Sequence, residues 1–221
     1  GLMGHSMPDG REKFDLDEFV AEFSLDRVTL GAPVFDQEKL SWLNGTWLRE
    51  LSDDGFADRV AEWALNREFL MQIVPLVKER TERLSDLADM TAYLLGEPPP
   101  YGAKAFAATG LEDESLLEIL QFVLWRLEAT DDWERQTLVD TLSTLAAELD
   151  MKIRALLAPL FVAISGRPVS LPLYDSMVIL GSDLSRARVR RAIEVLGGVS
   201  KKQAKRFEKR YRSLGGPSGE G

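Results

Sequence analysis

The sequence predicts an all-α protein that contains two consecutive helical bundles. Apolar residues recur at spacings of three and four along most of the 221 residues, as they do on the buried face of a helix. Strand-like alternation is almost absent, and Val162-Ala163-Ile164 is the only short stretch that favours a β-strand. Gly96-Glu97-Pro98-Pro99-Pro100 interrupts the helical pattern, so it predicts the boundary between the bundles.

The first two helices are predicted from the residues that begin them. Asp15 and Glu18 have the spacing of a capping box, and they precede the apolar stripe of a short helix over residues 15–23. A loop over residues 29–33 follows. Asp36 is a good N-cap for the next helix, because its carboxylate can accept from the free amides of the first turn. Gly45 is expected to weaken or bend that helix.

Three further helical segments lead to the proline-rich boundary. A break at residues 53–55 precedes an amphipathic helix that contains Phe56 and Trp63. Asn66 then caps a long segment that ends near Leu84. Pro75 lies inside this segment, where it should kink the helix or set its first turn. The last helix before the boundary is expected over residues 85–95.

At least five helices are predicted after residue 100. The helical patterns cover residues 102–108, 113–129, 131–149, 151–165, 171–180 and 184–196, and a basic stretch follows from Ser200. Asp131 or Asp132, together with Glu134, is expected to begin the third of these helices. Gly166-Arg167-Pro168 and Gly181-Ser182-Asp183 separate the later ones.

Composition argues against several classes of function. The chain has no Cys and a single His, His5, which excludes disulfides and thiolate metal sites and leaves Ser-His or Cys-His catalysis without support. Its apolar runs are too short to span a bilayer, and no signal-peptide pattern appears, so neither a membrane partner nor secretion is expected. The acidic residues near 113–118 and 131–134 lie at predicted helix starts, where they favour the helix dipole. We therefore assign no catalytic residue, metal or cofactor to this chain.

Charge is distributed unevenly along the sequence. The net charge is −9, yet residues 185–214 carry eleven Lys and Arg and only two acids, Glu194 and Glu208. That segment sums to +9, and the rest of the chain sums to −18. The asymmetry fits an anionic partner, although a basic helix that simply faces solvent explains the same pattern.

One stretch resembles a known family. Phe35-Asp36-Gln37-Glu38-Lys39-Leu40-Ser41-Trp42-Leu43-Asn44-Gly45 resembles the segment that follows the catalytic domain of bacterial-type glutamyl-tRNA synthetases. Residues 2–12, 158–167 and 173–181 resemble further parts of this family in the same order, so the resemblance spans roughly residues 2–198.

The resemblance implies a domain organisation. Residues 1–51 would form the end of the region that contacts the tRNA stem. Residues 52–100 and 101–198 would form the two bundles of an anticodon-binding α-helix cage. Residues 199–221 remain as a basic, partly disordered tail, since residues 215–219 have the composition of a disordered segment.

The resemblance also implies which residues contact tRNA(Glu). Arg80 falls where discriminating members of the family place an arginine that recognises the last anticodon base and separates glutamate tRNA from glutamine tRNA. Ser170, Leu173 and Tyr174 align with the loop and helix start that contact the anticodon bases. Four residues of the Asp36 helix would face the backbone of the anticodon stem or loop, namely Lys39, Trp42, Asn44 and Arg49.

Each of these residues also has an ordinary structural explanation. Arg80 could pair with a neighbouring Glu on a solvated helix, and Ser170 could cap a helix. Leu173 could belong to the core, and Tyr174 could be half-buried. The cations and the indole of the Asp36 helix could lie on a solvated face.

The chain departs from the family at one position. Phe161 stands after Pro159-Leu160, where the family usually has an arginine that donates to a base. Phe can stack or pack but cannot donate a hydrogen bond. Base recognition is then either transferred to Arg167 or Arg154, or partly lost.

These observations predict the anticodon-binding, C-terminal portion of a glutamyl-tRNA synthetase. The resemblance implies a cytoplasmic, monomeric parent whose separate catalytic domain uses ATP, with Mg, and glutamate. The chain alone is expected to bind tRNA weakly, not to bind DNA, and not to aminoacylate. The alternative is a helical protein-interaction module whose basic tail docks onto an acidic partner.

Overall fold

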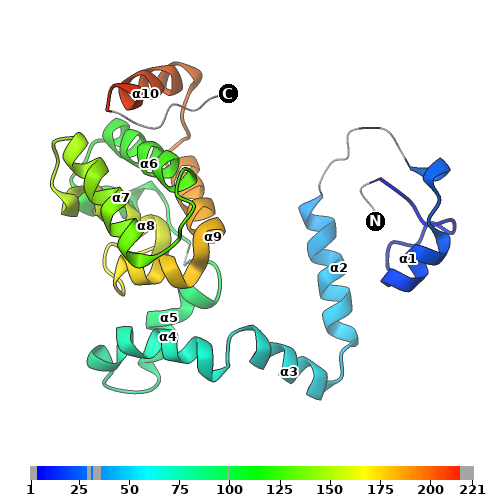
Figure 1. Cartoon of the computed structure of the whole chain (residues 1–221). Coiled ribbons are helices and arrows are strands. Elements are labelled where there is room, and N and C mark those ends of the chain that lie inside the picture. Colours follow the sequence, from blue (N-terminus) through cyan, green and yellow to red (C-terminus); the bar gives the residue numbers. More distant parts are fainter. Residues whose placement is uncertain (1–3, 29–30, 32–35, 99, 215–221) are drawn as a thin grey trace. The chain divides into compact units, whose positions relative to one another are not determined.

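The computed structural model describes residues 4–28, 31, 36–98 and 100–214, and every regular element in these ranges is a helix (Figure 1). This confirms the all-α prediction, and Val162-Ala163-Ile164 lies inside a helix. The chain divides into two compact units, residues 1–66 and 67–221. Most of the loop predicted over residues 29–33, Phe35, Pro99 and the predicted tail from Gly215 lie outside the described residues. No helix among the described residues is long and apolar enough to cross a membrane.

The N-terminal unit begins its helices with the caps that the sequence predicts. It contains α1 (Leu16–Glu22), the 3₁₀ helix η1 (Leu25–Arg27), α2 (Gln37–Glu50) and α3 (Asp53–Trp63). Asp15 and Glu18 form the predicted capping box, with the Glu18 amide donating to the Asp15 carboxylate over 2.8 Å. The Asp36 carboxylate accepts from the Lys39 amide at 2.9 Å. Both predicted caps are therefore confirmed.

The second unit contains the remaining helices. They are α4 (Arg67–Val77), η2 (Lys78–Arg80), α5 (Asp86–Leu95), η3 (Ala103–Thr109), α6 (Asp113–Glu128), α7 (Arg135–Glu148), α8 (Ile153–Ser165), α9 (Leu173–Val195) and α10 (Lys201–Ser213).

Four of these elements differ from the predictions. The segment expected to reach Leu84 ends its α-helix at Val77 and continues as η2 to Arg80, while Pro75 lies inside the last turn of the α-helix. Helix α7 begins at Arg135 with the predicted Glu134 as its N-cap, so it starts later than Asp131 or Asp132. The segment over 102–108 is a 3₁₀ helix. Gly181 interrupts α9 at a single residue, with φ 78° and ψ 170°, so the two helices predicted there are joined across a kink.

One continuous core fills the second unit. It includes Ile73 and Tyr93 from before the proline-rich segment, Leu160 from α8, and Phe207 from α10. The core therefore crosses the predicted bundle boundary at residue 100 and extends into the segment predicted as a tail. Helix α10 is an ordered element whose Phe207 is fully buried.

Arg188 on α9 connects three parts of this unit. Its side chain is only 5% exposed. The guanidinium donates to the carbonyl oxygens of Ile164 at 2.7 Å, Tyr93 at 2.7 Å and Gly96 at 2.6 Å. These carbonyls belong to the C-terminal ends of α8 and α5, which lack intrahelical donors and carry the negative end of the helix dipole. Burial lowers the pKa of Arg188, and the nearby Glu97 carboxylate opposes this shift.

A buried hydrogen bond joins α5 to α9 beside Arg188. The Tyr93 hydroxyl lies 2.6 Å from the Ser176 hydroxyl, and Ser176 in turn donates to the Pro172 carbonyl over 2.9 Å. Together with Arg188, this bond fixes α5 against the start and the middle of α9.

Replacing Arg188 by Met is expected to destabilise the fold by about 3 kcal/mol or more, because three buried carbonyls lose a charged donor. Arg190 is a matched control on the same helix, since it is exposed and pairs with Glu128 at 2.7 Å. Arg190→Met should cost less than about 1 kcal/mol. Urea denaturation of both variants measures the difference, and equal costs would contradict the role given to Arg188.

Candidate nucleic-acid interface

A pocket of about 320 Å³ lies between α5 and the loop that joins α8 to α9. It is lined by Arg80, Asp89, Met90, Tyr93, Arg167, Val169, Ser170 and Leu171. Two residues predicted from the sequence, Arg80 and Ser170, therefore meet at one cavity although 90 positions separate them in the chain.

Arg80 is the last residue of η2 and is exposed at the pocket. No ion pair joins it to a carboxylate of the described residues, and neither Glu79 nor Glu82 contacts it in this way. The alternative in which Arg80 pairs with a neighbouring Glu is therefore not what the structure shows. Arg80 therefore lines the pocket without an ion pair among the described residues.

The loop on the opposite wall is shaped by the end of α8. Gly166 ends this helix with φ 74°, in the left-handed region that favours glycine. The Ser165 hydroxyl then accepts from the Arg167 amide at 3.3 Å and donates to the Phe161 carbonyl over 2.7 Å. This turn directs Arg167 toward α5, where its guanidinium reaches the Asp89 carbonyl at 3.5 Å.

Tyr93 and Ser170 form the polar base of the pocket. Burial raises the pKa of the Tyr93 phenol, while hydrogen bonds to Ser176 and Ser170 and the charges of Arg188 and Arg80 oppose the shift. The phenol therefore stays neutral at physiological pH and keeps a hydroxyl group for hydrogen bonding. Ser170 is half-buried and also donates to the Leu171 carbonyl at 3.2 Å.

The pocket combines charge with apolar surface. Arg80 and Arg167 supply two guanidinium groups against a single carboxylate, that of Asp89. Val169 is 80% exposed, and with Met90 it offers apolar surface beside those donors. An unpaired RNA base needs such a combination of an apolar surface and directed hydrogen-bond donors. The described residues contain no cluster of His, Cys, Asp or Glu that could hold a metal ion.

Comparison with known proteins identifies the family to which the part of the chain around this pocket belongs. The anticodon binding domain family matches residues 55–193, which include every residue that lines the pocket. The chain belongs to this family.

Full-length relatives of this anticodon-binding domain are known. The glutamate–tRNA ligase of Marinomonas sp. is 53% identical over 215 residues, which are 97% of this chain and 44% of that protein. The glutamate–tRNA ligase of Alcanivorax borkumensis is 48% identical over 214 residues, 97% of this chain and 43% of that protein. The chain thus spans less than half the length of these relatives.

A solved structure supports the fold. The glutamate tRNA ligase from Elizabethkingia meningosepticum superimposes with a TM-score of 0.55 at 23% identity, over 88% of this chain and 39% of that one.

Leu173 and Tyr174 do not line the pocket of the anticodon-binding domain. Leu173 is 3% exposed and packs in the core, and Tyr174 is half-buried against it. Burial raises the pKa of Tyr174, and the charge of Arg135 opposes the shift. A contact of either residue with tRNA stays a prediction. Phe161 is also half-buried against the core, so it occupies a packing position.

The residues predicted on α2 lie in the N-terminal unit. Trp42 is 52% exposed, Asn44 is exposed, and Lys39 pairs with Glu12 at 2.5 Å. Arg49 folds back to donate to the Thr46 hydroxyl at 3.2 Å, over Gly45, where a Cβ would stand 2.9 Å from the guanidinium. A side chain at position 45 would require only a shift of the flexible Arg49 guanidinium, and α2 continues through Gly45 to Glu50.

Sequence reasoning missed five residues of the pocket, namely Asp89, Met90, Tyr93, Val169 and Leu171. The sequence contains a signal for Tyr93, because a tyrosine inside an amphipathic helix places its hydroxyl near the core and needs a polar partner there. The partner, Ser176, lies 83 positions away, so only the fold brings the two together.

The raised pKa of Tyr93 predicts a specific loss of stability at high pH. The unfolded tyrosine ionises near pH 10 while the folded one keeps its proton, so stability falls as pH rises above 10. The loss reaches about 1.4 kcal/mol per pH unit for one such group. At pH 8 the Tyr93→Phe variant should be about 1 kcal/mol less stable than the unmodified chain, because it lacks the hydrogen bond to Ser176. Between pH 9.5 and 11, however, its free energy of unfolding should fall by less than that of the unmodified chain. Parallel denaturation curves in that range would contradict this assignment.

Proposed function

We propose that the pocket bounded by Arg80, Arg167 and Ser170 binds the anticodon of tRNA(Glu). The observation that supports this proposal is the convergence of Arg80, exposed and without an ion pair among the described residues, with Ser170 on one cavity of about 320 Å³. The family match covers both sides of that cavity. Guanidinium donors are suited to base edges and to phosphates, and Met90 and Val169 offer surface to an unstacked base.

Within this proposal Arg80 recognises the last anticodon base. A guanidinium can donate two hydrogen bonds in a fixed plane, so it distinguishes base edges by their acceptors. Arg80 forms no ion pair with a carboxylate of the described residues, so its guanidinium is not committed to such a pair.

Phe161 stands where the family usually has an arginine, and in this proposal Arg167 supplies that missing guanidinium. Two candidates follow from the sequence, Arg167 and Arg154. Arg167 lines the pocket together with Arg80, whereas Arg154 is exposed on α8 and does not line it. We therefore assign the second guanidinium donor to Arg167.

The residues of α2 are proposed to contact the RNA backbone. Lys39, Trp42, Asn44 and Arg49 are exposed or half-buried, and none of them is committed to a core. Contacts of this kind position an RNA without recognising its sequence.

The wider role is that of the anticodon-binding portion of a glutamate–tRNA ligase. Near-complete coverage of this chain by ligases of about twice its length supports it. In such a ligase ATP, with Mg²⁺, and glutamate would bind to residues outside this chain. The proposal takes the protein to be cytoplasmic and monomeric, and the chain alone to bind tRNA without aminoacylating it.

Arg80→Ala tests the anticodon contact directly. Binding of a tRNA(Glu) transcript should weaken by about 1–3 kcal/mol, the usual contribution of one guanidinium contact to a base. Binding of a transcript with a changed last anticodon base should hardly alter. Arg83→Ala is the matched control, because Arg83 is exposed three positions further on and does not line the pocket. Filter binding at several salt concentrations measures the affinity of each of the two variants for each of the two transcripts. A failure of the unmodified chain to bind tRNA at low salt would overturn the proposal.

Arg167→Ala tests the transferred donor. It should weaken tRNA(Glu) binding by about 1–3 kcal/mol, while Arg154→Ala should leave binding within about 0.5 kcal/mol. The same titration serves both variants. If Arg154→Ala has the larger effect, the donor was assigned to the wrong residue, and if neither matters, the arginine function is lost in this chain.

A further inference from the structure

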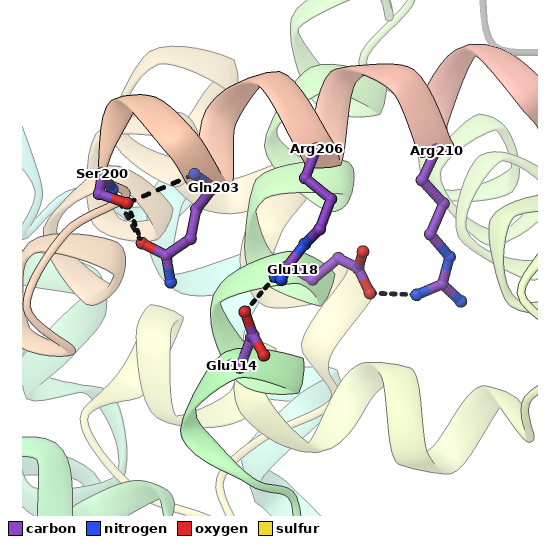
Figure 2. A network of polar contacts seen from close by, with 6 residues as sticks. All are labelled: Glu114, Glu118, Ser200, Gln203, Arg206 and Arg210. Atoms are coloured by element: carbon purple, nitrogen blue, oxygen red, sulfur yellow. Dashed lines mark hydrogen bonds and ion pairs between the residues drawn. The ribbon is translucent and has the colours of Figure 1, made fainter.

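Helix α10 is a strongly basic helix that lies outside the matched family region. It carries seven Lys and Arg and one acid, Glu208, over Lys201–Ser213. Its start is fixed by a capping box, in which the Ser200 hydroxyl accepts from the Gln203 amide at 3.3 Å and the Gln203 side chain accepts from the Ser200 amide at 3.0 Å (Figure 2). The start of the helix is therefore fixed by local side chains.

One face of α10 is held against α6. Phe207 and Tyr211 are buried, with their rings 6.2 Å and 5.3 Å from that of Phe122. Beside them, Figure 2 shows Arg206 and Arg210 extending from α10 toward two carboxylates of α6. Arg206 pairs with Glu114, and Arg210 pairs with Glu118. These contacts fix which side of α10 faces the domain.

The opposite side of α10 carries four lysines. At 100° per residue, Lys201, Lys202, Lys205 and Lys209 lie on the side of the helix away from Phe207. All four are exposed. We call them the lysine face. None of the four has an ion-pair partner among the described residues, in contrast to Arg206, Arg210 and Arg212.

The stability of the helix does not explain the lysine face. Lys201 and Lys202 stand in the first turn, where the positive end of the helix dipole disfavours cations. Lys201, Lys205 and Lys209 repel one another at spacings of four. Helix α10 would be more stable with neutral residues there, so the four charges need another explanation.

We propose that the lysine face binds the sugar–phosphate backbone of RNA, as a second contact of the tRNA that the pocket binds. The inference thus rests on the proposed function. Lys201, Lys205 and Lys209 span about 12 Å along the helix, enough to meet more than one phosphate. Lysine gives a point charge that attracts phosphates without recognising bases.

An acidic protein fits this face less well. A protein interface normally has an apolar centre surrounded by polar residues, and the lysine face contains no apolar side chain. The apolar residues Phe207 and Tyr211 are already used against α6. Helix α10 also contributes no residue to the pocket, so its contact adds affinity without adding selectivity for the anticodon.

The test neutralises the whole lysine face in K201Q/K202Q/K205Q/K209Q. Each lost phosphate contact lowers the slope of log affinity against log salt by about 0.7 to 0.9, so the slope for tRNA should fall by about 3. Between 50 and 200 mM salt, the quadruple variant should then lose roughly 60-fold less affinity than the unmodified chain. The effect should be equal for tRNA(Glu), for a transcript with a changed anticodon and for an unrelated RNA duplex.

Two controls make the result specific. K205Q/K209Q is matched by K104Q/K152Q, which removes the same charge from two exposed lysines on other elements. Circular dichroism and thermal unfolding should show all variants folded, because none of these side chains is buried. If the two double variants lower the salt slope of RNA binding equally, the effect comes from net charge alone and the inference is overturned.

The outcomes separate this inference from the proposed function. If Arg80→Ala alters anticodon-dependent binding but the quadruple variant leaves the salt slope unchanged, only the lysine face is refuted. If anticodon dependence is absent but the quadruple variant still lowers the slope for the RNA duplex, the backbone contact stands alone. Binding of poly-glutamate that depends on the four lysines, with RNA binding unaffected, would assign the face to an acidic protein and overturn the inference.

Discussion

The buried guanidinium of Arg188 is the interaction on which the architecture of the second unit depends. A cation in a core is stable only if its donors are satisfied, and here the acceptors are the terminal carbonyls of α5 and α8. Those two helix ends lead to opposite walls of the pocket. Tyr93 lies on α5, and Arg167 follows α8. One side chain of α9 therefore sets the relation between the helix and the loop whose residues would contact a base.

Local chemistry explains why much of the fold can be predicted and why some of it cannot. The starts of α1 and α2 depend on side chains within four residues, so Asp15 and Asp36 are visible in the sequence. Arg188 is different, because it stands among basic residues that look like one solvated segment. Its helical position does contain a signal, since Ser185, Val189 and Ala192 share its buried face. Two of its three acceptors, the Tyr93 and Gly96 carbonyls, lie more than 90 positions away.

The pocket shows the same limit. Arg80 and Ser170 follow from resemblance to a family, and the structure brings them to one cavity. Leu173 belongs to the core, because the first turn of α9 places it on the buried side while Ser170 stays in the preceding loop. The sequence indicates that Tyr93 needs a polar partner, but only the fold shows that this partner is Ser176. Residues that meet only through tertiary packing leave no pattern in a single sequence.

The basic end of the chain illustrates why net charge is a poor guide to partners. Its arginines are largely used internally: Arg186 and Arg188 donate to carbonyls, and Arg190 and Arg206 pair with glutamates. Arginine suits these positions because its planar fork matches carbonyl and carboxylate acceptors. The lysines of α10 face solvent instead. Because salt screens charges beyond about 8 Å, a ligand at that face meets the lysines and not the distant acidic bulk. A chain with a net charge of −9 can therefore present a surface that attracts a polyanion.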